Sequence, residues 1–322
     1  MTWDYFVFIA DTIENINNTQ EISVSFECLA SGFVDEVSLR FFLGGDKERA
    51  RKNYIDKARK SDTKNQKCDF LSGVVPDFSH LPSLNWIGLQ VDFELLTPWY
   101  SKDDRVFHVL DNPVRKDRVF GVPFMAASSW KGMLRWACRM RNGLREHLER
   151  HNNRLDNWRD PDWILHLFGN EKEEKENFRQ GALVFYPTWF NKIGFEVINP
   201  HSRERRAGTQ PIYYEVVPEI RPNEEGGKGT LSLLYAPWPG MKFSADSTKF
   251  SADPKEVLPK LLEAIEYLLT VYGISAKRTV GWGTAKITEW RAFHKDGGEV
   301  KESDRGALWK KVQTWLSVGG TP

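Results

Sequence analysis

The order of the hydrophobic periodicities between residues 86 and 290 constrains the fold of this chain most. From 86 to 95, apolar residues alternate with polar ones, which is the period of a half-buried strand. Apolar residues recur at steps of three and four over 128–150 and again over 253–272, which indicates two amphipathic helices. Further strand-like segments lie at 181–187, 229–237 and 281–290. The order β-α-β-β-α-β predicts an α+β fold, a ferredoxin-like antiparallel sheet backed by two helices.

The two predicted helices have different start signals. Ser128 or Ser129 is a natural N-cap for the first helix. Asp253 and Pro254 read as an N-cap followed by proline at the first helical position, although Pro259 is an alternative start.

Segments outside this pattern divide the chain into further parts. Residues 1–84 form an N-terminal extension, and the predicted core domain covers 85–291 with an insertion at 188–227. The tail at 292–322 holds a polar loop and a short helix. Within the extension, strands are predicted at 6–10, 21–30 and 36–44. A short exposed helix with nine Lys or Arg, running into a linker, is predicted at 46–67.

The composition excludes several classes of protein. Lys and Arg number 45 against 44 Asp and Glu, so binding of a polyanion needs a local patch rather than a global field. Three cysteines lie far apart without a CxxC pair, which excludes a disulfide framework and a structural zinc site. The apolar run at 5–10 is too short for a signal peptide or a membrane-spanning helix, and no later apolar run approaches the length of about 18 residues that a membrane span needs. We therefore expect a soluble, cytoplasmic protein without membrane contact.

A local basic patch lies between Asp111 and Arg145, where eight Lys or Arg accompany two Asp. Lys131, Arg135 and Arg139 are spaced by four residues, so they line one edge of the first predicted helix. An isolated carboxylate, a helix N-terminus and a row of cations together indicate a site that holds a polyanion, with RNA as the first candidate. A solvated helix face explains the same charges equally well.

Four motifs on this ferredoxin-like, or RRM-like, core resemble the RAMP superfamily of CRISPR proteins. They are similar to motifs in the backbone subunits of type III (Csm and Cmr) effector complexes. In chain order they are DNPVR at 111–115, PFMAASSWKGMLR at 123–135, LFGN at 167–170 and the glycine-rich turn at 273–283. All four occur in the expected order over about two thirds of the chain.

The sequence departs from the family pattern in three places. The opening of about 84 residues has no counterpart in the minimal subunit. Ala126 and Ala127 replace the usual Pro-Gly pair, and Val280 and Trp282 stand where shorter residues are common. These departures leave open which subunit and subtype the chain resembles.

The resemblance implies a subunit that packs along a guide RNA (crRNA) and contacts its backbone without reading its sequence. Its implied partners are the guide, a complementary target RNA, other CRISPR effector subunits and further copies of the chain itself. The insertion at 188–227 would be a hairpin between guide and target. Tyr213 and Tyr214 are available for stacking there, and core residues are an equal alternative for them. The predicted RNA-binding residues are Arg115, Ser128, Ser129, Lys131, Arg135, Arg139, Arg203, Arg205, Arg206, Lys277 and Arg278.

The resemblance also places Asp111 at the position of an aspartate required for metal-dependent cleavage of the paired target RNA. Asp111 is therefore the predicted catalytic residue and the predicted ligand of Mg²⁺ or another divalent cation. His108 and Lys116 lie near enough in sequence to assist. An Asx-type turn is the structural alternative for Asp111, because Asp-Asn-Pro suits such a turn.

Three functions stay open from the sequence. The first is a guide-binding endoribonuclease that cuts complementary RNA through Asp111. The second is a non-catalytic scaffold or capping subunit of the same complex. The third is a metal-independent, histidine-based endoribonuclease that processes the guide precursor, against which the placement of DNPV and SSWKG argues.

Overall fold

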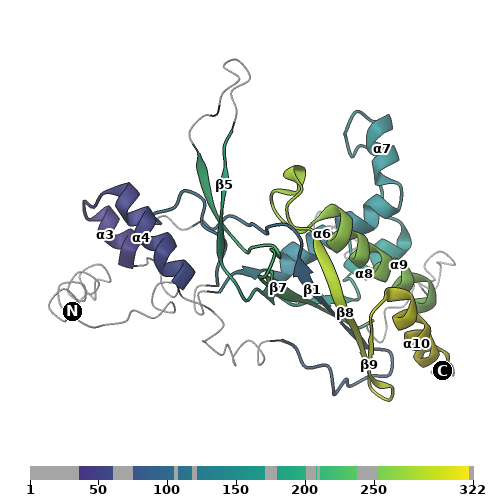
Figure 1. Cartoon of the computed structure of the whole chain (residues 1–322). Helices are drawn as coiled ribbons and strands as arrows, with labels where there is room; N and C mark the ends of the chain where they lie inside the picture. Colours follow the sequence, from purple (N-terminus) through teal and green to yellow (C-terminus); the bar gives the residue numbers. More distant parts are fainter. Residues whose placement is uncertain are drawn as a thin grey trace, which may run out of the picture.

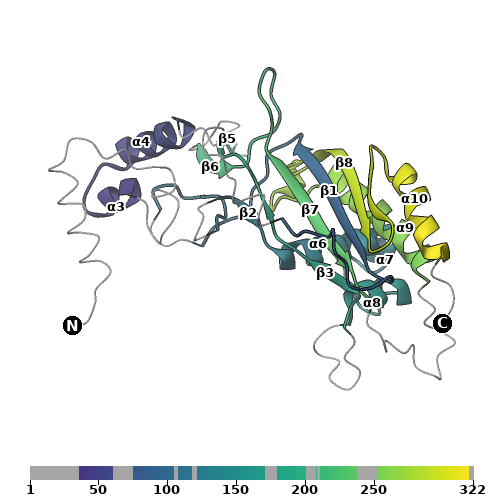
Figure 2. The same cartoon turned by 90° about the horizontal axis from the view of Figure 1, so that it is seen from below.

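The structure is a computed structural model that describes residues 36–60, 75–104, 108–117, 122–170, 180–200, 208, 211–237 and 253–318. A five-stranded sheet with strand order β3-β7-β1-β8-β9 forms its centre (Figures 1 and 2). Its strands are β1 (Ile87–Leu95), β3 (Leu183–Phe185), β7 (Lys228–Tyr235), β8 (Ala285–His294) and β9 (Gly298–Glu302). Two smaller sheets pair β2 (Phe124–Met125) with β4 (Thr188–Trp189), and β5 (Gly194–Ile198) with β6 (Ile212–Val216).

The connectivity confirms the predicted ferredoxin-like fold. The central strand β1 is antiparallel to β7 on one side and to β8 on the other, and β3 pairs with β7. α6 (Ala127–Arg141) follows β1 and α9 (Pro254–Tyr267) follows β7 in the chain. β9 extends the sheet beyond the predicted four strands. Further helices are α7 (Leu144–Arg150), α8 (Asp162–Phe168) and α10 (Arg305–Val318).

Helices cover one face of the sheet (Figure 2) and bury the apolar side of β1. Val91 and Phe93 of β1 and Trp130 and Leu134 of α6 are at most 1 % exposed. Burial of side chains of this size contributes about 1.5–3 kcal/mol each. The predicted half-buried strand is covered on both faces at its start, where Phe78 packs so closely that a Cβ on Gly88 would lie 2.6 Å from its ring.

Several sequence expectations about element bounds are wrong. The segment 36–44 is not a strand, because Glu36–Phe42 forms helix α3. The predicted helix 128–150 breaks at Gly143, whose φ of 88° is left-handed, into α6 and α7. The last core strand begins at 285 rather than 281, since residues 278–283 form a short 3-10 turn followed by left-handed glycines.

The expected cap of α9 is confirmed, whereas that of α6 is wrong. The Asp253 carboxylate accepts a hydrogen bond from Lys255 N at 2.9 Å, and Pro259 lies inside the helix. The N-cap of α6 is Ala126, without a side-chain hydrogen bond, so neither Ser128 nor Ser129 caps the helix. Both serines lie within its first turn.

The N-terminal helices pack beside the loop that follows β1 and the β5–β6 hairpin (Figure 1). Tyr54 of α4 (Lys47–Lys60) and Val37 of α3 are buried together with Val109 and Leu110, and Phe195 of β5 packs against them. The predicted helix is therefore present, but one of its faces is buried. The predicted strands 6–10 and 21–30 lie outside the described residues. No helix in the described part of the chain is long and apolar enough to cross a membrane.

A buried ion pair joins these N-terminal helices to the core. Lys116 Nζ lies 2.5 Å from Glu215 Oε1, and both side chains are at most 2 % exposed. Tyr54 donates its hydroxyl proton to Glu215 at 2.8 Å and accepts from Lys116 at 2.9 Å, while Val114 N donates to the second carboxylate oxygen. Burial raises the pKa of Glu215, but the attraction of Lys116 and His108 and the hydrogen bonds from Lys116 and Tyr54 together outweigh it and lower that pKa below the usual glutamate range.

We predict that Lys116→Met destabilises the protein by roughly 3–5 kcal/mol, because Glu215 stays buried without its counter-charge. The matched double variant Lys116→Met/Glu215→Leu should regain most of the loss, since no charge is then buried. Urea unfolding measures both. Because the pKa of Glu215 is lower in the folded protein than in the unfolded chain, its ionised carboxylate stabilises the fold at pH values above the usual glutamate pKa. This stability is lost as the pH falls through the pKa of the folded state. The free energy of unfolding of the double variant should therefore depend less on pH in the acid range than that of the wild type. Equal stability of the wild type and Lys116→Met in urea would contradict this account.

Candidate functional site

A pocket of about 420 Å³ lies at the N-terminus of α6. Four of the residues that the sequence assigns to RNA binding line it together: Arg115, Ser128, Ser129 and Arg278. They come from the loop after β1, from the first turn of α6 and from the glycine-rich loop before β8. Residues that are more than 150 positions apart in the chain thus meet at one place, as the sequence expectation required.

The first turn of α6 contributes backbone N–H groups to this pocket. Ser129 N and Trp130 N already donate to the Ala126 carbonyl, at 3.0 and 3.2 Å. The N–H groups of Ala127 and Ser128 precede them and have no carbonyl inside the helix to donate to. These groups carry the positive end of the helix dipole, which favours a phosphate at this position.

Arg278 adds a cation whose environment suits an anionic ligand. Its guanidinium lies 4.5 Å from the centre of the Trp136 ring. Burial lowers its pKa from the usual arginine value. The Nη1 atom is buried and has no hydrogen-bond partner among the described residues. Because Arg278 lines the pocket, the guanidinium donors on its pocket side suit a phosphate oxygen.

The glycine-rich loop holds Arg278 in place through close backbone contacts. Gly283 has a φ of 92°, and a Cβ there would lie 2.3 Å from Ser275 N. Ser275 Oγ accepts from Tyr100 N at 3.0 Å, which ties the loop to the segment that follows β1. Trp99 supports the same junction by donating from its indole to the Ile274 carbonyl at 3.0 Å. The glycines are thus required by backbone geometry and close approach.

The other predicted cations of α6 differ from the sequence expectation of an open row. Arg135 Nη2 and Arg139 Nε each lie 2.6 Å from the carboxylate of Asp160, which is 2 % exposed. Burial raises the pKa of Asp160, but hydrogen bonds from Arg139, Trp158 and Arg135 lower it more. Lys131 is exposed. Phosphate would compete with Asp160 for the two arginines, so their RNA-binding role stays a prediction.

The aromatic residues of the insertion are also engaged within the protein. Tyr214 is 6 % exposed and packs edge-on against Tyr100 and Trp282, with Lys277 Nζ 5.0 Å from its ring centre. Tyr213 lies beneath the guanidinium of Arg51. Of the two alternatives for Tyr214, the structure therefore supports the core residue and not the stacking residue. The predicted RNA-binding residues Arg203, Arg205 and Arg206 lie outside the described residues.

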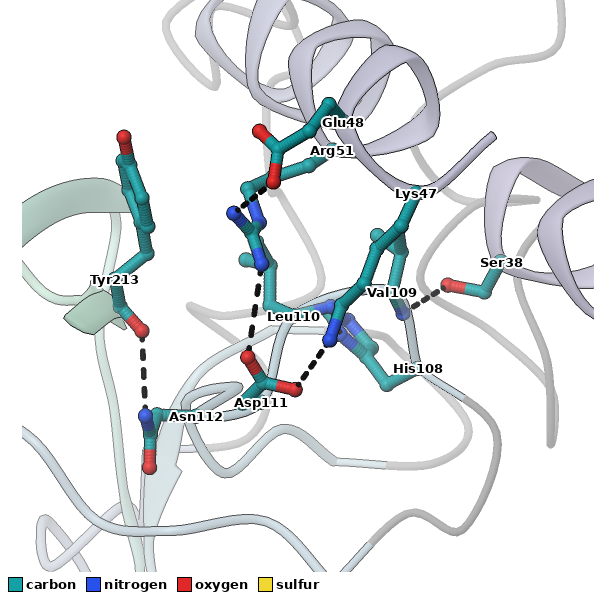
Figure 3. A network of polar contacts seen from close by, with 10 residues as sticks. All are labelled: Ser38, Lys47, Glu48, Arg51, His108, Val109, Leu110, Asp111, Asn112 and Tyr213. Atoms are coloured by element: carbon teal, nitrogen blue, oxygen red, sulfur yellow. Dashed lines mark hydrogen bonds and ion pairs between the residues drawn. The ribbon is translucent and has the colours of Figure 1, made fainter. Parts of the chain in front are cut away.

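Asp111 lies in the loop after β1 and faces two cations of α4 (Figure 3). Its Oδ1 atom is 3.0 Å from Lys47 Nζ and its Oδ2 atom is 3.6 Å from Arg51 Nη2. The Asp111 side chain is 64 % exposed. Next to it, the Asn112 side chain donates to the Tyr213 carbonyl at 3.4 Å. Sequence reasoning missed Lys47 and Arg51, because charge alone did not distinguish them from the other cations of their segment.

The donor set around Asp111 does not fit a divalent cation held by the protein alone. Mg²⁺ takes six oxygen ligands, and where one or two carboxylates hold it, waters and substrate phosphates supply the rest. Among the described residues no three side chains of metal-binding type converge, and the nearest charged partners of Asp111 are cations. The expected assistance from Lys116 is wrong, since that side chain is buried against Glu215. His108 is 9 % exposed, and its Nδ1 accepts from Leu110 N.

The α6 pocket and Asp111 lie on either side of a shared wall. In this wall Lys102 pairs with Val114, and Arg115 N donates to the Ser101 carbonyl at 2.7 Å. Ser101 and Arg115 line the α6 pocket. Lys102 instead lines a second pocket, of about 690 Å³, together with Asp111 and Lys47. A chain of nucleotides that crosses this wall would contact both pockets.

Comparison with known proteins gives a family and a distant structural likeness. The family model of the RAMP superfamily matches residues 92–286. A chain of the cryo-EM structure of "the Type III-B Cmr-beta bound to cognate target RNA" is 14 % identical, with a TM-score of 0.43. The match covers 80 % of this chain and 82 % of that one. No curated protein matches the sequence.

We predict that Arg278→Ala lowers affinity for single-stranded RNA by roughly tenfold or more, because a charge-assisted hydrogen bond to phosphate is lost. The slope of log affinity against log salt should fall by about one, whatever the RNA sequence. Filter-binding titrations at several salt concentrations measure both. Lys286→Ala removes an exposed cation of β8 that does not line the pocket and is the control. An unchanged salt slope for Arg278→Ala would exclude the pocket as a phosphate site.

Proposed function

The chain belongs to the RAMP superfamily, and we propose that it is a guide-RNA-binding subunit of a type III CRISPR effector complex that cleaves complementary target RNA through Asp111. The type III assignment rests on the four sequence motifs, all of which the structure describes. Its proposed partners are the guide, the target RNA and other subunits of the complex, further copies of this chain among them.

The observation that carries guide binding is the pocket in which Arg278 and the N-terminus of α6 meet. Its polar groups are backbone N–H groups, hydroxyls and guanidinium groups, which suit phosphate oxygens. Contacts of this kind fix the position of an RNA backbone but do not read bases. A subunit that must accept guides of any sequence needs this type of contact.

Cleavage is supported by the exposure and surroundings of Asp111. Its pocket of about 690 Å³ has the size of small-ligand sites and leaves room for a nucleotide. In the proposed step the Asp111 carboxylate takes the proton of a ribose 2′-hydroxyl, whose oxygen then bonds to the adjacent phosphorus. The bond between phosphorus and the 5′-oxygen breaks, and that oxygen takes a proton from water. The products are a 2′,3′-cyclic phosphate and a 5′-hydroxyl end.

The role of Mg²⁺ or another divalent cation stays a prediction. No part of the step above depends on such an ion, because the side chains around Asp111 do not form a ligand set for one. A comparison of cleavage with Mg²⁺ and with a chelator decides the requirement directly.

A non-catalytic scaffold subunit is the second candidate, and one observation favours it. Asp111 accepts two ion pairs from α4, which is what a carboxylate that anchors the N-terminal helices would do. In that case the protein would hold guide and target without cutting either. The two candidates differ in whether loss of Asp111 abolishes cleavage while RNA binding persists.

We predict that Asp111→Ala and Asp111→Asn lower the cleavage rate by roughly 10²-fold or more, because the proton acceptor is lost. The cleavage rate of labelled complementary RNA is measured with the guide-loaded complex of each variant, once with Mg²⁺ and once with a chelator. Binding of the same RNA is measured in parallel. Asp56→Asn, an exposed acid of α4, should cut like wild type. Equal cleavage by wild type and Asp111→Ala, or binding without cleavage by both, would favour the scaffold function.

A further inference from the structure

We infer that α4 supplies the cationic half of the cleavage site, with Lys47 contacting the scissile phosphate and Arg51 positioning Asp111. This inference rests on the proposed cleavage at Asp111 and assigns two residues to it that the sequence motifs do not contain. Both come from the N-terminal extension, which lies outside the part of the chain matched by the family model.

Arg51 is held so firmly that it can fix the orientation of Asp111. Its side chain is only 10 % exposed. Nη1 donates to Glu48 Oε1 at 2.9 Å, and the guanidinium carbon lies 4.9 Å from the centre of the Tyr213 ring. The remaining terminal nitrogen, Nη2, faces Asp111 Oδ2 at 3.6 Å. Because the guanidinium is planar and already contacts Glu48 and the Tyr213 ring, its Nη2 atom has a defined position relative to Asp111.

Lys47 has the exposure and reach of a group that contacts substrate. Its side chain is 44 % exposed, and its Nζ lies 3.0 Å from Asp111 Oδ1, the oxygen that Arg51 leaves open. Lys47 lines the pocket in which Asp111 lies. Its ammonium group rotates freely and has three donors, so it can bind a phosphate oxygen without leaving the carboxylate.

The exposure of Asp111 favours this arrangement over a contact that blocks the site. With 64 % of its side chain exposed, the carboxylate is open to a ligand while both cations stay in place. Figure 3 shows Lys47 and Arg51 approaching from α4 on one side only.

The charge balance of the pocket explains why such cations are needed. Asp103, Asp104 and Asp111 line it together with Lys47 and Lys102, so its carboxylates outnumber its lysines by three to two. Attack by the 2′-oxygen then adds negative charge to the phosphoryl oxygens. A fixed cation beside the carboxylate attracts the phosphate and stabilises the charge that develops in the transition state.

The docking of α4 keeps these cations in place. Tyr54, which follows Lys47 and Arg51 in α4, forms hydrogen bonds with the buried Lys116–Glu215 pair. Tyr54 and Ala58 also belong to the apolar cluster that α4 forms with Val109 and Leu110. Because a helix is rigid over this length, the position of Tyr54 determines where Lys47 and Arg51 lie relative to Asp111.

The test compares Lys47→Ala, Lys47→Arg and Lys52→Ala in the guide-loaded complex under single-turnover conditions at saturating target. Lys47→Ala should lower the cleavage rate by roughly 10²-fold, as expected for loss of a group that stabilises the transition state. Lys47→Arg keeps the charge and should recover most of the rate. Lys52 is an exposed lysine of the same helix, so Lys52→Ala should cut like wild type. Affinity for the target should change little, because many other contacts hold the duplex.

A positioning role for Arg51 makes a different prediction in the same assay. Arg51→Lys keeps the charge but loses the planar fork, so it should not restore the rate that Arg51→Ala loses. A merely structural role of Lys47 does not predict a large loss, since exposed ion pairs contribute little stability. The melting temperature of each variant is measured alongside to show this.

Three results would overturn the inference, and they are distinguishable. If Asp111→Ala abolishes cleavage while Lys47→Ala cuts at the wild-type rate, only the role of α4 is wrong. If Asp111→Ala cuts like wild type, the proposed cleavage site and the role of α4 are both wrong. Equal losses in Lys47→Ala and Lys47→Arg would also contradict a role that depends on charge.

Discussion

The buried pair of Lys116 and Glu215 is the interaction on which the candidate cleavage site depends. Its two charges are compensated by each other, by Tyr54 and by the Val114 backbone, so these groups must be in place together. They come from the loop after β1, from the β5–β6 hairpin and from α4. A single desolvated ion pair thus holds together three segments that surround Asp111, and none of them belongs to the central sheet.

The two candidate sites differ in how they are built. The α6 pocket is made by the core itself, because a helix N-terminus and a glycine-rich loop meet where β1 ends. The surroundings of Asp111 are made by added segments that dock on the core. The proposed phosphate contacts are therefore built by the core, while the proposed chemistry at Asp111 also depends on the docked helix α4.

The errors of the sequence analysis have identifiable physical causes. The segment 36–44 is rich in β-branched and aromatic residues, which suggested a strand, but it packs as helix α3 on α4 and the loop near Leu110. Tertiary packing overrode its local preference. Arg135 and Arg139 have the spacing of a phosphate-binding row, yet Asp160 neutralises them from a loop about 20 residues away. Spacing along a helix shows which residues share a face, but not which partner meets them.

By itself the sequence determined the ferredoxin-like core, the place of Asp111 in the loop after β1 and the meeting of Ser128, Ser129 and Arg278. Periodicity reports which faces are buried, and the order of the elements then leaves few ways to pair the strands. Only the tertiary structure decided that Lys47 and Arg51 face Asp111 and that Lys116 is withdrawn to Glu215. The reason is physical: these contacts join residues 60 or more positions apart through side-chain packing, which no local pattern encodes.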